Sequence, residues 1–522
     1  MRKSYTTDEL VKVISDEFGG ILRSNLYETT LKEDELEKLR KRKIKLRESL
    51  KNCGIGDNQA KEYVKGAIKS ILTEKLKING ENIDKIIPFD NENVMSTRDK
   101  FDIALYRYKV IWGYDGLSKM LEEYKVGEGD IKCFNDETVD IIYRDCCHKM
   151  EFDDKLNIVA ERVYAHYRGL GVVDEIRDMN VDGVLGGVSG REGTYNSVWV
   201  VHKGVMIHFT FLDFACENEL ARICMNIYRY DNPRQLSRKT GYVVNQMKDH
   251  SRVVVVRPPF SESYAFFVRK FNTIKKKDIK ELIKDDNAGL PIDVIKWIVK
   301  GCQVTAVTGM QGSGKTTLLM AMIEYIHPAY TLRIQEMAFE LHLRDVYEDR
   351  NIITFRETDD IPAQDGLDLQ KKTDGNVNIL GEIASSPVAA LMVQMTQSGS
   401  IFTMFTHHAV TTDSLIKYLR NSLLSCKIFT DERVALEQVV QAVRFDIHLS
   451  KSVDGHRYIQ RITQIRETYN KKVYETVDIV SFENGRYMFK NMISDDVIAA
   501  IKEQLTEDEK GEFDDSMALW KS

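Results

Sequence analysis

Hydrophobic positions in the second half of the chain fall into short continuous runs, separated by stretches in which apolar residues recur with helical spacing. The short runs are rich in β-branched residues, as expected of parallel strands that are buried on both faces. They cover residues 303–308, 331–336, 351–356, 376–382 and 401–406. Strands that alternate with helices in this way predict an α/β domain with a parallel, doubly wound sheet over residues 291–505.

Residues 156–275 mix strand and helix signals in a less regular order. The alternating run at 197–209 surrounds Lys203-Gly204 and predicts a β-hairpin. Further elements are predicted as helices at 156–167 and 217–228 and as strands at 252–256 and 264–271. We therefore expect a compact α+β domain over 156–275. The polar residues that follow predict a linker over 276–290.

Residues 1–155 are mostly charged, with helical patterns and few strand signals, and we interpret them as a helical N-terminal adaptor. Asp57 follows a glycine-containing break and is predicted to cap a helix that runs to Lys75. A dense basic run consists of Lys38, Arg40, Lys41, Arg42, Lys43, Lys45 and Arg47. A solvated helix stabilised by i,i+4 ion pairs is the favoured interpretation of this run, and attraction to an anionic membrane or an acidic partner is the alternative.

Composition narrows the class of protein. The chain has 522 residues and a formal net charge of -6, with 43% hydrophobic residues. This length suggests about three domains, and the negative charge gives no basic field for nucleic acid. No apolar stretch is long enough for a membrane helix, and the N-terminus lacks a signal-peptide pattern, so the cytoplasm is expected. Residues 506–522 are acidic, and we expect a tail that is frayed over Thr506 to Asp515.

The segment from Gly309 to Thr317 fits the pattern G-x-x-x-x-G-K-[ST], with a predicted strand before it and a predicted helix after it. Glycines let the backbone approach phosphates closely, so that successive amides form an anion site. Lys315 supplies positive charge to the β- and γ-phosphates, and Thr316 offers a hydroxyl to Mg²⁺. ATP and Mg²⁺ are therefore the expected ligands. The predicted binding residues are Gly309, Gln311, Gly312, Ser313, Gly314, Lys315, Thr316 and Thr317.

Three candidate catalytic side chains follow predicted strands of the same sheet. Glu336, Glu382 and His408 all fall at carboxyl ends of strands, where open α/β sheets bind their ligands. A magnesium nucleotide needs one acid near the metal and another that orients the attacking water. Either glutamate could instead cap the segment that follows it. His407 and His408 are not separated by periodicity, and either could be an ordinary core histidine.

These motifs together resemble a known family. The set comprises the phosphate loop, Glu336-x-x-x-Glu340-Leu341, Ile379-Leu380-Gly381-Glu382, Gly399-Ser400-x-x-Thr403 and Thr406-x-His408-Ala409. Their order is similar to the Walker A loop, aspartate box, Walker B motif and histidine box of the secretion traffic ATPases, which drive type II secretion, type IV secretion and type IV pili. Arg257-Pro258-Pro259 and the run 268–271 resemble the end of that family's N-terminal domain. The tight-adherence pilus and type IV secretion branch fits best.

The resemblance implies a RecA-like P-loop NTPase core that works as a hexameric ring, with ATP between N-terminal and C-terminal domains. It implies an ATPase motor that acts on an inner-membrane platform protein and is cytoplasmic, peripheral to the cytoplasmic membrane. No nucleic-acid partner is expected. It also implies catalytic roles for Glu336 as the water-polarising acid, Glu382 as the Walker B acid, His408 as a sensor, and Arg257 and Arg269 as arginines that neutralise transition-state charge.

The sequence departs from the family pattern at several positions. Ala384 and Pro387 stand where the family usually has an arginine and a glutamate after Gly-Glu, and Ser400 replaces the first histidine of the histidine box. The arginine-proline-aspartate before the Walker B strand is Asp374-Gly375-Asn376 here. The alternative to a motor is therefore a degenerate ATP-binding regulatory subunit with little hydrolysis. A DNA-handling NTPase is a third possibility, which the acidic net charge disfavours.

Overall fold

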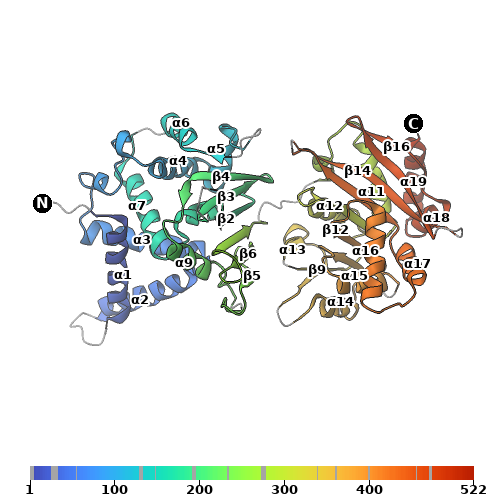
Figure 1. Cartoon of the computed structure of the whole chain (residues 1–522), viewed down its shortest axis with the longest axis horizontal. Helices are drawn as coiled ribbons and strands as arrows, with labels where there is room; N and C mark the ends of the chain where they lie inside the picture. Colours follow the sequence, from blue (N-terminus) through green and yellow to red (C-terminus); the bar gives the residue numbers. More distant parts are fainter. Residues whose placement is uncertain are drawn as a thin grey trace. The chain divides into compact units, whose positions relative to one another are not determined.

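The computed structural model describes two compact units, one within residues 1–273 and one within 274–522 (Figure 1). The described residues are 5–24, 33–54, 56–127, 133–146, 149–190, 195–231, 234–271, 278–337, 339–358, 361–397, 400–453, 455–468 and 473–521. Within these ranges no helix is both long and apolar enough to cross a membrane.

The first unit contains a sheet whose described strands have the order β1-β4-β3-β2-β7-β6-β5. The strands are β1 (Cys133–Phe134), β2 (Gly183–Val188), β3 (Ser197–His202), β4 (Val205–Asp213), β5 (Tyr242–Gln246), β6 (Arg252–Val256) and β7 (Ala265–Arg269). All neighbours are antiparallel except β1 and β4. The predicted hairpin is confirmed as β3 and β4, and its turn residues Lys203 and Gly204 have positive φ values of 49° and 76°.

Helices make up the rest of this unit. They are α1 (Thr7–Arg23), α2 (Glu33–Cys53), α3 (Asn58–Ser70), α4 (Thr97–Trp112), α5 (Gly116–Glu123), α6 (Asp136–Cys146), α7 (Phe152–Tyr167), α8 (Asp174–Asp178) and α9 (Glu217–Ile227). Of these, α4, α8 and α9 pack against the sheet. The predicted cap is confirmed, because the Asp57 carboxylate accepts a hydrogen bond of 3.0 Å from the amide of Ala60 at the start of α3. The basic run lies on the exposed face of α2, where Lys41 forms an i,i+4 ion pair with Glu37.

The helical segment 1–155 and the sheet share their cores. Phe101 of α4 and Phe134 of β1 contact Phe209 of β4, with ring centroids 5.0–6.0 Å apart. Strand β1 also pairs with β4 and so belongs to the sheet. Both parts therefore lie in one unit, although the change in sequence pattern near residue 155 favours a division there.

The second unit contains a sheet with the order β10-β9-β11-β12-β8-β13-β14-β15-β16 among its described strands. The strands are β8 (Thr305–Gly309), β9 (Leu332–Glu336), β10 (Ile352–Arg356), β11 (Val377–Leu380), β12 (Phe402–His407), β13 (Phe445–Lys451), β14 (Arg457–Glu467), β15 (Tyr474–Glu483) and β16 (Arg486–Phe489). Pairing is parallel from β10 to β13 and antiparallel from β13 to β16. The predicted parallel core and its five strands are confirmed.

Helices cover both faces of this sheet, as in other doubly wound folds. They are α10 (Ile279–Leu282), α11 (Gly289–Lys300), α12 (Lys315–Met322), α13 (Leu343–Val346), α14 (Ala363–Lys371), α15 (Ser386–Met395), α16 (Thr412–Ser425), α17 (Glu432–Ala442), α18 (Asp495–Glu503) and α19 (Glu507–Trp520). The described part of the predicted linker 276–290 is folded, since α10 lies within it and Ile279 and Ile283 are buried in the core.

The expectation of a frayed C-terminus is wrong. Residues 507–520 form α19, which begins with a capping box between Thr506 and Glu509. Phe513, Met517 and Trp520 recur at helical spacing and are buried, while the acidic residues face solvent. The Trp520 indole also donates a hydrogen bond of 2.7 Å to Asp293. The prediction of a tail was based on the high acidic content, and it therefore missed the apolar residues that recur at helical spacing.

Replacement of Phe513 by Ala tests the contribution of α19. Phe513 is fully buried, with its ring centroid 5.3 Å from that of Trp297, so Phe513→Ala should lower the unfolding free energy of the second unit by about 3–5 kcal/mol. Leu519→Ala is the matched control, because Leu519 is 71% exposed and should change stability by less than about 0.5 kcal/mol. Urea denaturation followed by circular dichroism measures both. Equal, small effects would show that α19 does not stabilise the unit.

Candidate nucleotide-binding site

The phosphate loop connects the buried strand β8 to helix α12, as the sequence predicts. Gly309 ends the strand with φ 142°, and Gly314 precedes the helix with φ 98°. A Cβ atom on Gly309 would lie 2.3 Å from the backbone carbonyl oxygen of Leu449 on β13. A side chain cannot be accommodated there, so the parallel pairing of β8 with β13 requires glycine at the start of the loop.

Lys315 directs its ammonium group back into the loop. The Nζ atom donates hydrogen bonds to the carbonyls of Gly309 at 2.9 Å and Met310 at 3.0 Å, and it lies 3.2 Å from Nδ1 of His408. The residue is 7% exposed, and burial lowers its pKa, an effect that the charge of Glu382 opposes. The ammonium is thus held by neutral acceptors at positions suited to exchange for phosphate oxygens.

His408 connects Lys315 to Glu382. Its Nε2 lies 3.0 Å from Oε1 of Glu382, while its Nδ1 faces the Lys315 ammonium, which can only donate. Nδ1 is therefore an acceptor, and the ring proton sits on Nε2 and points at the carboxylate. The structure thus brings together three residues that the sequence predicts for the site: Glu382 after β11, His408 after β12, and Lys315 at the start of α12.

His407 has a different role. It ends β12, is 9% exposed, and its Nδ1 accepts a hydrogen bond of 3.0 Å from the Ala409 amide. Its ring lies 4.4 Å from that of Tyr418, and burial lowers its pKa to about 4. His407 is therefore a neutral core histidine, whereas His408 is the one that lies next to Lys315 and Glu382.

Glu336 lies at the end of β9 and is buried, with 5% exposure. Its Oε1 accepts hydrogen bonds from the amides of Glu340 at 3.0 Å and Leu341 at 2.8 Å. Its Oε2 has no hydrogen-bond partner among the described residues. Burial raises its pKa to about 8, against the effect of the two amides. Glu336 therefore does cap the following turn, and it also keeps one buried carboxyl oxygen unpaired.

Glu336 is close to the Walker B segment. A Cβ atom on Gly381 would lie 3.1 Å from the Glu336 Cγ atom and 3.4 Å from Oε1. Gly381 in turn accepts a hydrogen bond of 2.5 Å from the Thr406 hydroxyl. The absence of a side chain at 381 thus allows the acid of β9 to lie beside the residue that precedes Glu382.

A buried polar group behind the loop was not identified from the sequence. The Thr308 hydroxyl lies 2.6 Å from Asp446 and 2.8 Å from Nδ1 of His448, and the Thr412 hydroxyl donates to Asp446 at 2.7 Å. Burial raises the pKa of Asp446 and lowers that of His448 to about 4. The alternation of Asp446 and His448 along an otherwise apolar strand is the signal that could have revealed this group.

Arg457 is a second residue that sequence reasoning missed. Its Nε donates a hydrogen bond of 2.9 Å to the Gly312 carbonyl at the crest of the loop. The neighbouring His456 pairs with Asp285 at 3.0 Å. The antiparallel extension of the sheet therefore contacts the phosphate loop directly.

The loop itself fits a phosphate group. Ser313 is fully buried, and its hydroxyl has no hydrogen-bond partner among the described residues. Gln311 and Gly312 are exposed, and Thr316 and Thr317 are half-buried in the first turn of α12. An unpaired hydroxyl, a buried ammonium and a helix N-terminus thus converge on one loop, which is the donor set that binds nucleotide phosphates.

The two predicted arginines lie in the first unit. The Arg257 Nε donates to the Pro258 carbonyl at 3.2 Å, and its guanidinium lies 5.5 Å from the Tyr264 ring. Arg269 ends β7 and is exposed. Their role toward a nucleotide stays a prediction. Gly399 of the histidine-box resemblance lies outside the described residues, and Ser400 donates to the Met395 carbonyl at 3.3 Å.

The fold and the loop together define a RecA-like P-loop core, in which the loop-bearing strand β8 lies between β12 and β13 of a parallel sheet. An α+β sheet domain and helical N-terminal segments precede this core. Residues 253–493 match the family model described as Type II/IV secretion system protein. That match supports the type II/IV secretion ATPase superfamily as the group to which this part of the chain is similar.

Solved structures that the chain matches include two proteins described as ATPases and one described as a pilus retraction motor. The VirB11 ATPase of the Brucella suis type IV secretion system, solved with sulphate, is 18% identical, with 54% of this chain and 89% of that chain covered and a TM-score of 0.31. The ATPase DotB of Legionella pneumophila is 15% identical, with coverages of 58% and 80% and a TM-score of 0.40. The pilus retraction motor PilT, solved with ADP, is 16% identical, with coverages of 66% and 88% and a TM-score of 0.41.

With sequence identities of 15–18%, these structural matches assign no activity to the chain. No curated protein matches the sequence.

The raised pKa of Glu336 predicts a pH-dependent stability. Between its usual pKa of 4.5 and about 8, the folded form keeps a proton that the unfolded chain has lost, so the unfolding free energy falls as pH rises through this window. Glu336→Gln keeps an oxygen acceptor for the two amides and removes the ionisation. Its stability relative to wild type should therefore grow from pH 5 to pH 9, by at most about 5 kcal/mol.

Urea denaturation at pH 5, 7 and 9 measures this difference. Glu503→Gln, which makes the same change at an exposed position on α18, is the control. A difference for Glu336→Gln that does not change with pH would contradict the neutral state assigned to the buried carboxyl.

Proposed function

We propose that the chain is an ATP-hydrolysing motor of type II/IV secretion or type IV pilus assembly, in the tight-adherence pilus and type IV secretion branch. The observation that carries this proposal is the contact chain from Lys315 through His408 to Glu382, beside the buried Glu336. The match of residues 253–493 to the secretion family supports the same assignment.

ATP would be held by the loop amides, the Ser313 hydroxyl and Lys315, whose ammonium exchanges its two carbonyl partners for phosphate oxygens. Thr316 would contribute its hydroxyl to Mg²⁺, with the Glu382 carboxylate as the nearby acid. Magnesium bound with the nucleotide supplies positive charge that stabilises the phosphate oxygens. The residues therefore fit a magnesium nucleotide.

The remaining residues would act on the water and on its proton. Glu336 is largely protonated near pH 7 without a nearby cation, because its pKa is raised to about 8. A cation near a carboxyl lowers its pKa, so magnesium held close to Glu336 would favour the ionised carboxylate, which can orient the attacking water. When Lys315 turns toward phosphate, Nδ1 of His408 loses its contact with the ammonium. Because His408 also contacts Glu382, the presence of a phosphate group at Lys315 would affect Glu382.

Assembly as a hexamer follows from the same proposal. Met310 and Val410, which flank the site in sequence, are 68% and 61% exposed, and apolar side chains of this kind favour burial against another subunit. Arg257 and Arg269 would supply positive charge to the transition state from the first unit of the chain. We propose that the ring is cytoplasmic and works on an inner-membrane platform protein, without a nucleic-acid partner.

A second candidate function is an ATP-binding regulatory subunit with little hydrolysis. It is favoured by the replacement of family residues by Ala384, Pro387 and Ser400. In the structure Pro387 occupies the first turn of α15, so this position offers no charged group next to Glu382.

Phosphate release separates the two candidates. Wild type with Mg²⁺ and ATP should release phosphate, and Glu382→Gln should release it at least about tenfold more slowly while still binding a fluorescent ATP analogue. Lys315→Ala should lose both binding and release. Glu503→Gln, far from the loop in sequence and exposed, should match wild type.

The outcomes distinguish the proposals. Background release by wild type and Glu382→Gln alike, with nucleotide binding retained, would overturn the motor and leave the regulatory subunit. Loss of all nucleotide binding by wild type would overturn both. Sedimentation of Glu382→Gln with ATP and Mg²⁺ tests the ring, which requires a mass of six chains.

A further inference from the structure

Helix α2 carries concentrated positive charge, although the chain as a whole has a net charge of -6. Seven of the ten residues from 38 to 47 are Lys or Arg, and none is acidic. Lys51 adds an eighth cation before the helix ends at Cys53. The positive charge is therefore a local property of this helix, and the nucleotide site does not explain it.

Most of these cations face solvent. Those that are exposed and have no carboxylate within 4 Å in the described part of the chain are Lys38, Arg42, Lys45, Arg47 and Lys51. Lys41 does have such a partner, Glu37, one turn earlier. The i,i+4 ion pairs that the sequence favours for this run are thus reduced to one among the described residues, and most of the charge is open to an anionic partner.

Two rows of cations run along α2. The first row has the spacing i, i+3, i+4 and i+7 and consists of Lys38, Lys41, Arg42 and Lys45. The second row has the spacing i, i+7 and i+11 and consists of Arg40, Arg47 and Lys51. From residue 38 to residue 51 the helix extends about 20 Å, so the two rows form a long surface and not a single binding point. These seven side chains are called the basic surface below.

An exposed aliphatic side chain lies within the basic surface. Ile44 is 55% exposed and belongs to the second row, because it follows Arg40 by four positions and precedes Arg47 by three. On the opposite side of the helix, Leu46 and Leu50 are buried in a core shared with α3. The solvent side of α2 therefore combines cations with an aliphatic group, as helices that lie on a membrane surface do.

The side chains of α2 favour lipid over nucleic acid as the partner. The helix has no aromatic residue between Glu33 and Cys53, whereas proteins that hold single strands stack the bases on aromatic side chains. An anionic bilayer presents many phosphates in one plane, with an apolar layer beneath them. Long Lys and Arg side chains from both rows can reach this plane, and Ile44 can enter the layer below it.

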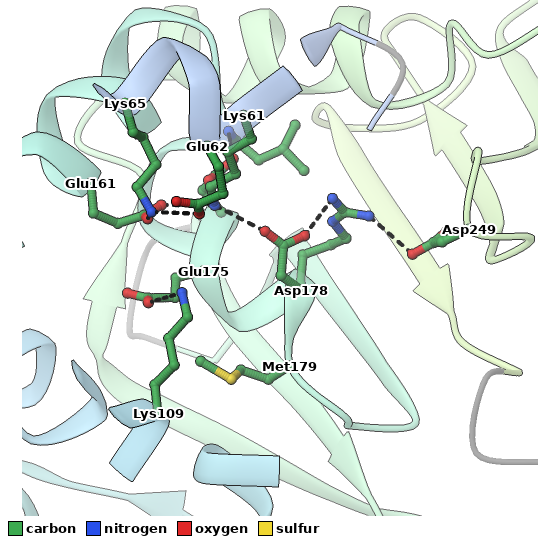
Figure 2. A network of polar contacts seen from close by, with 12 residues as sticks. Lys61, Glu62, Lys65, Lys109, Glu161, Glu175, Asp178, Met179 and Asp249 are labelled. Atoms are coloured by element: carbon green, nitrogen blue, oxygen red, sulfur yellow. Dashed lines mark hydrogen bonds and ion pairs between the residues drawn. The ribbon is translucent and has the colours of Figure 1, made fainter. Parts of the chain in front are cut away.

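The helix that bears the basic surface is firmly attached to the rest of the first unit. Helix α2 packs against α3. In turn, the Lys61 ammonium of α3 contacts three acids of α7 and α8, which are Glu161 at 2.7 Å, Asp174 at 2.5 Å and Asp178 at 2.9 Å (Figure 2). These buried ion pairs hold α3 in place, and α3 holds α2.

The same ion pairs extend to the sheet. Asp178 also contacts Arg177 at 2.5 Å, and Arg177 contacts Asp249 at 3.0 Å (Figure 2). Asp249 lies between β5 and β6, so the network connects α3 to the sheet of the first unit. The basic surface is thus held in one orientation relative to that sheet, and a contact of α2 with a flat surface would orient the whole unit.

We propose that the basic surface of α2 docks the chain onto a bilayer that contains anionic phospholipid. Its cations contact the headgroup phosphates, and Ile44 enters the boundary between headgroups and acyl chains. The contact is with lipid, so it goes beyond the proposed action on a platform protein, and it does not depend on the nucleotide site.

Sedimentation with sucrose-loaded vesicles tests this contact in the full chain. Wild type should sediment with vesicles of phosphatidylcholine mixed with phosphatidylglycerol, and it should stay in solution with vesicles of phosphatidylcholine alone. Because the attraction is electrostatic, high salt should release the bound protein. Equal binding to both kinds of vesicle, or binding to neither, overturns the proposal.

Removal of charge tests whether α2 makes the contact. The variant that combines Lys38→Gln, Arg42→Gln, Arg47→Gln and Lys51→Gln keeps a good helix former at each position. It should bind the anionic vesicles at least about tenfold more weakly than wild type. The matched control removes the same charge at exposed positions elsewhere, with Lys85→Gln, Lys239→Gln, Lys417→Gln and Arg433→Gln. Equal losses in the two variants overturn the assignment to α2.

Replacement of the aliphatic residue is a second test that keeps every cation. Ile44→Ser should weaken binding to the anionic vesicles by about fivefold, because it removes an aliphatic side chain from the bilayer boundary. Unchanged binding by this variant contradicts the proposed entry of Ile44 into the bilayer.

Competition distinguishes the bilayer from other anionic partners. Duplex DNA and poly-glutamate are added to the anionic vesicles at the same salt concentration. If either polymer displaces the vesicles and binds more tightly than they do, and the charge-removal variant loses that binding, the partner is not a bilayer and the proposal is overturned. Circular dichroism establishes that each variant is folded, and phosphate release reports separately on the proposed motor function.

Discussion

The burial of the Lys315 ammonium is the constraint on which the second unit depends. A buried cation must have acceptors, and here they are two loop carbonyls and one imidazole nitrogen. This arrangement requires β8 to lie between β12 and β13, so that the loop begins next to Leu449 and His408 follows the neighbouring strand. The need for glycine at 309 and the contact of Glu382 with His408 both depend on this placement. Phosphate binding would exchange acceptors around a charge that is already desolvated, which costs less than burying a new one.

Much of the second unit could be predicted from local patterns. The strands of the parallel core are short and apolar, and the phosphate loop has a spacing that few other structures share. The positions of Glu382 and His408 followed from one topological rule, since the carboxyl ends of parallel strands meet at one edge. Their contact with each other, and the proton on Nε2 of His408, required coordinates. The buried state of Glu336 was also inaccessible, because a strand-end glutamate looks the same in sequence whether it is solvated or enclosed.

The features that sequence reasoning missed depend on distant pairings or on mixed signals. Thr308 meets Asp446 across 138 positions, and only the order of strands in the sheet brings them together. Arg457 reaches Gly312 across 145 positions for the same reason. In α19 the apolar residues at 513, 517 and 520 are outnumbered by acidic ones, so composition favoured a tail where periodicity indicates a helix. The strand that joins residues 1–155 to the first sheet, β1, has only two residues and gives no periodic signal.

Lys61 has a consequence for how the first unit can be divided. This one ammonium group, from a helix near the N-terminus, faces three acidic side chains that lie between residues 161 and 178. A shortened protein that started near residue 156, where mixed strand and helix patterns replace mostly charged helical ones, would keep those acids and lose their shared counter-ion. These acidic side chains would then lie close together without their shared cation, and their mutual repulsion would oppose folding. The early helices thus supply the cation that neutralises these acids, and the smallest version of this unit that folds by itself has to include them.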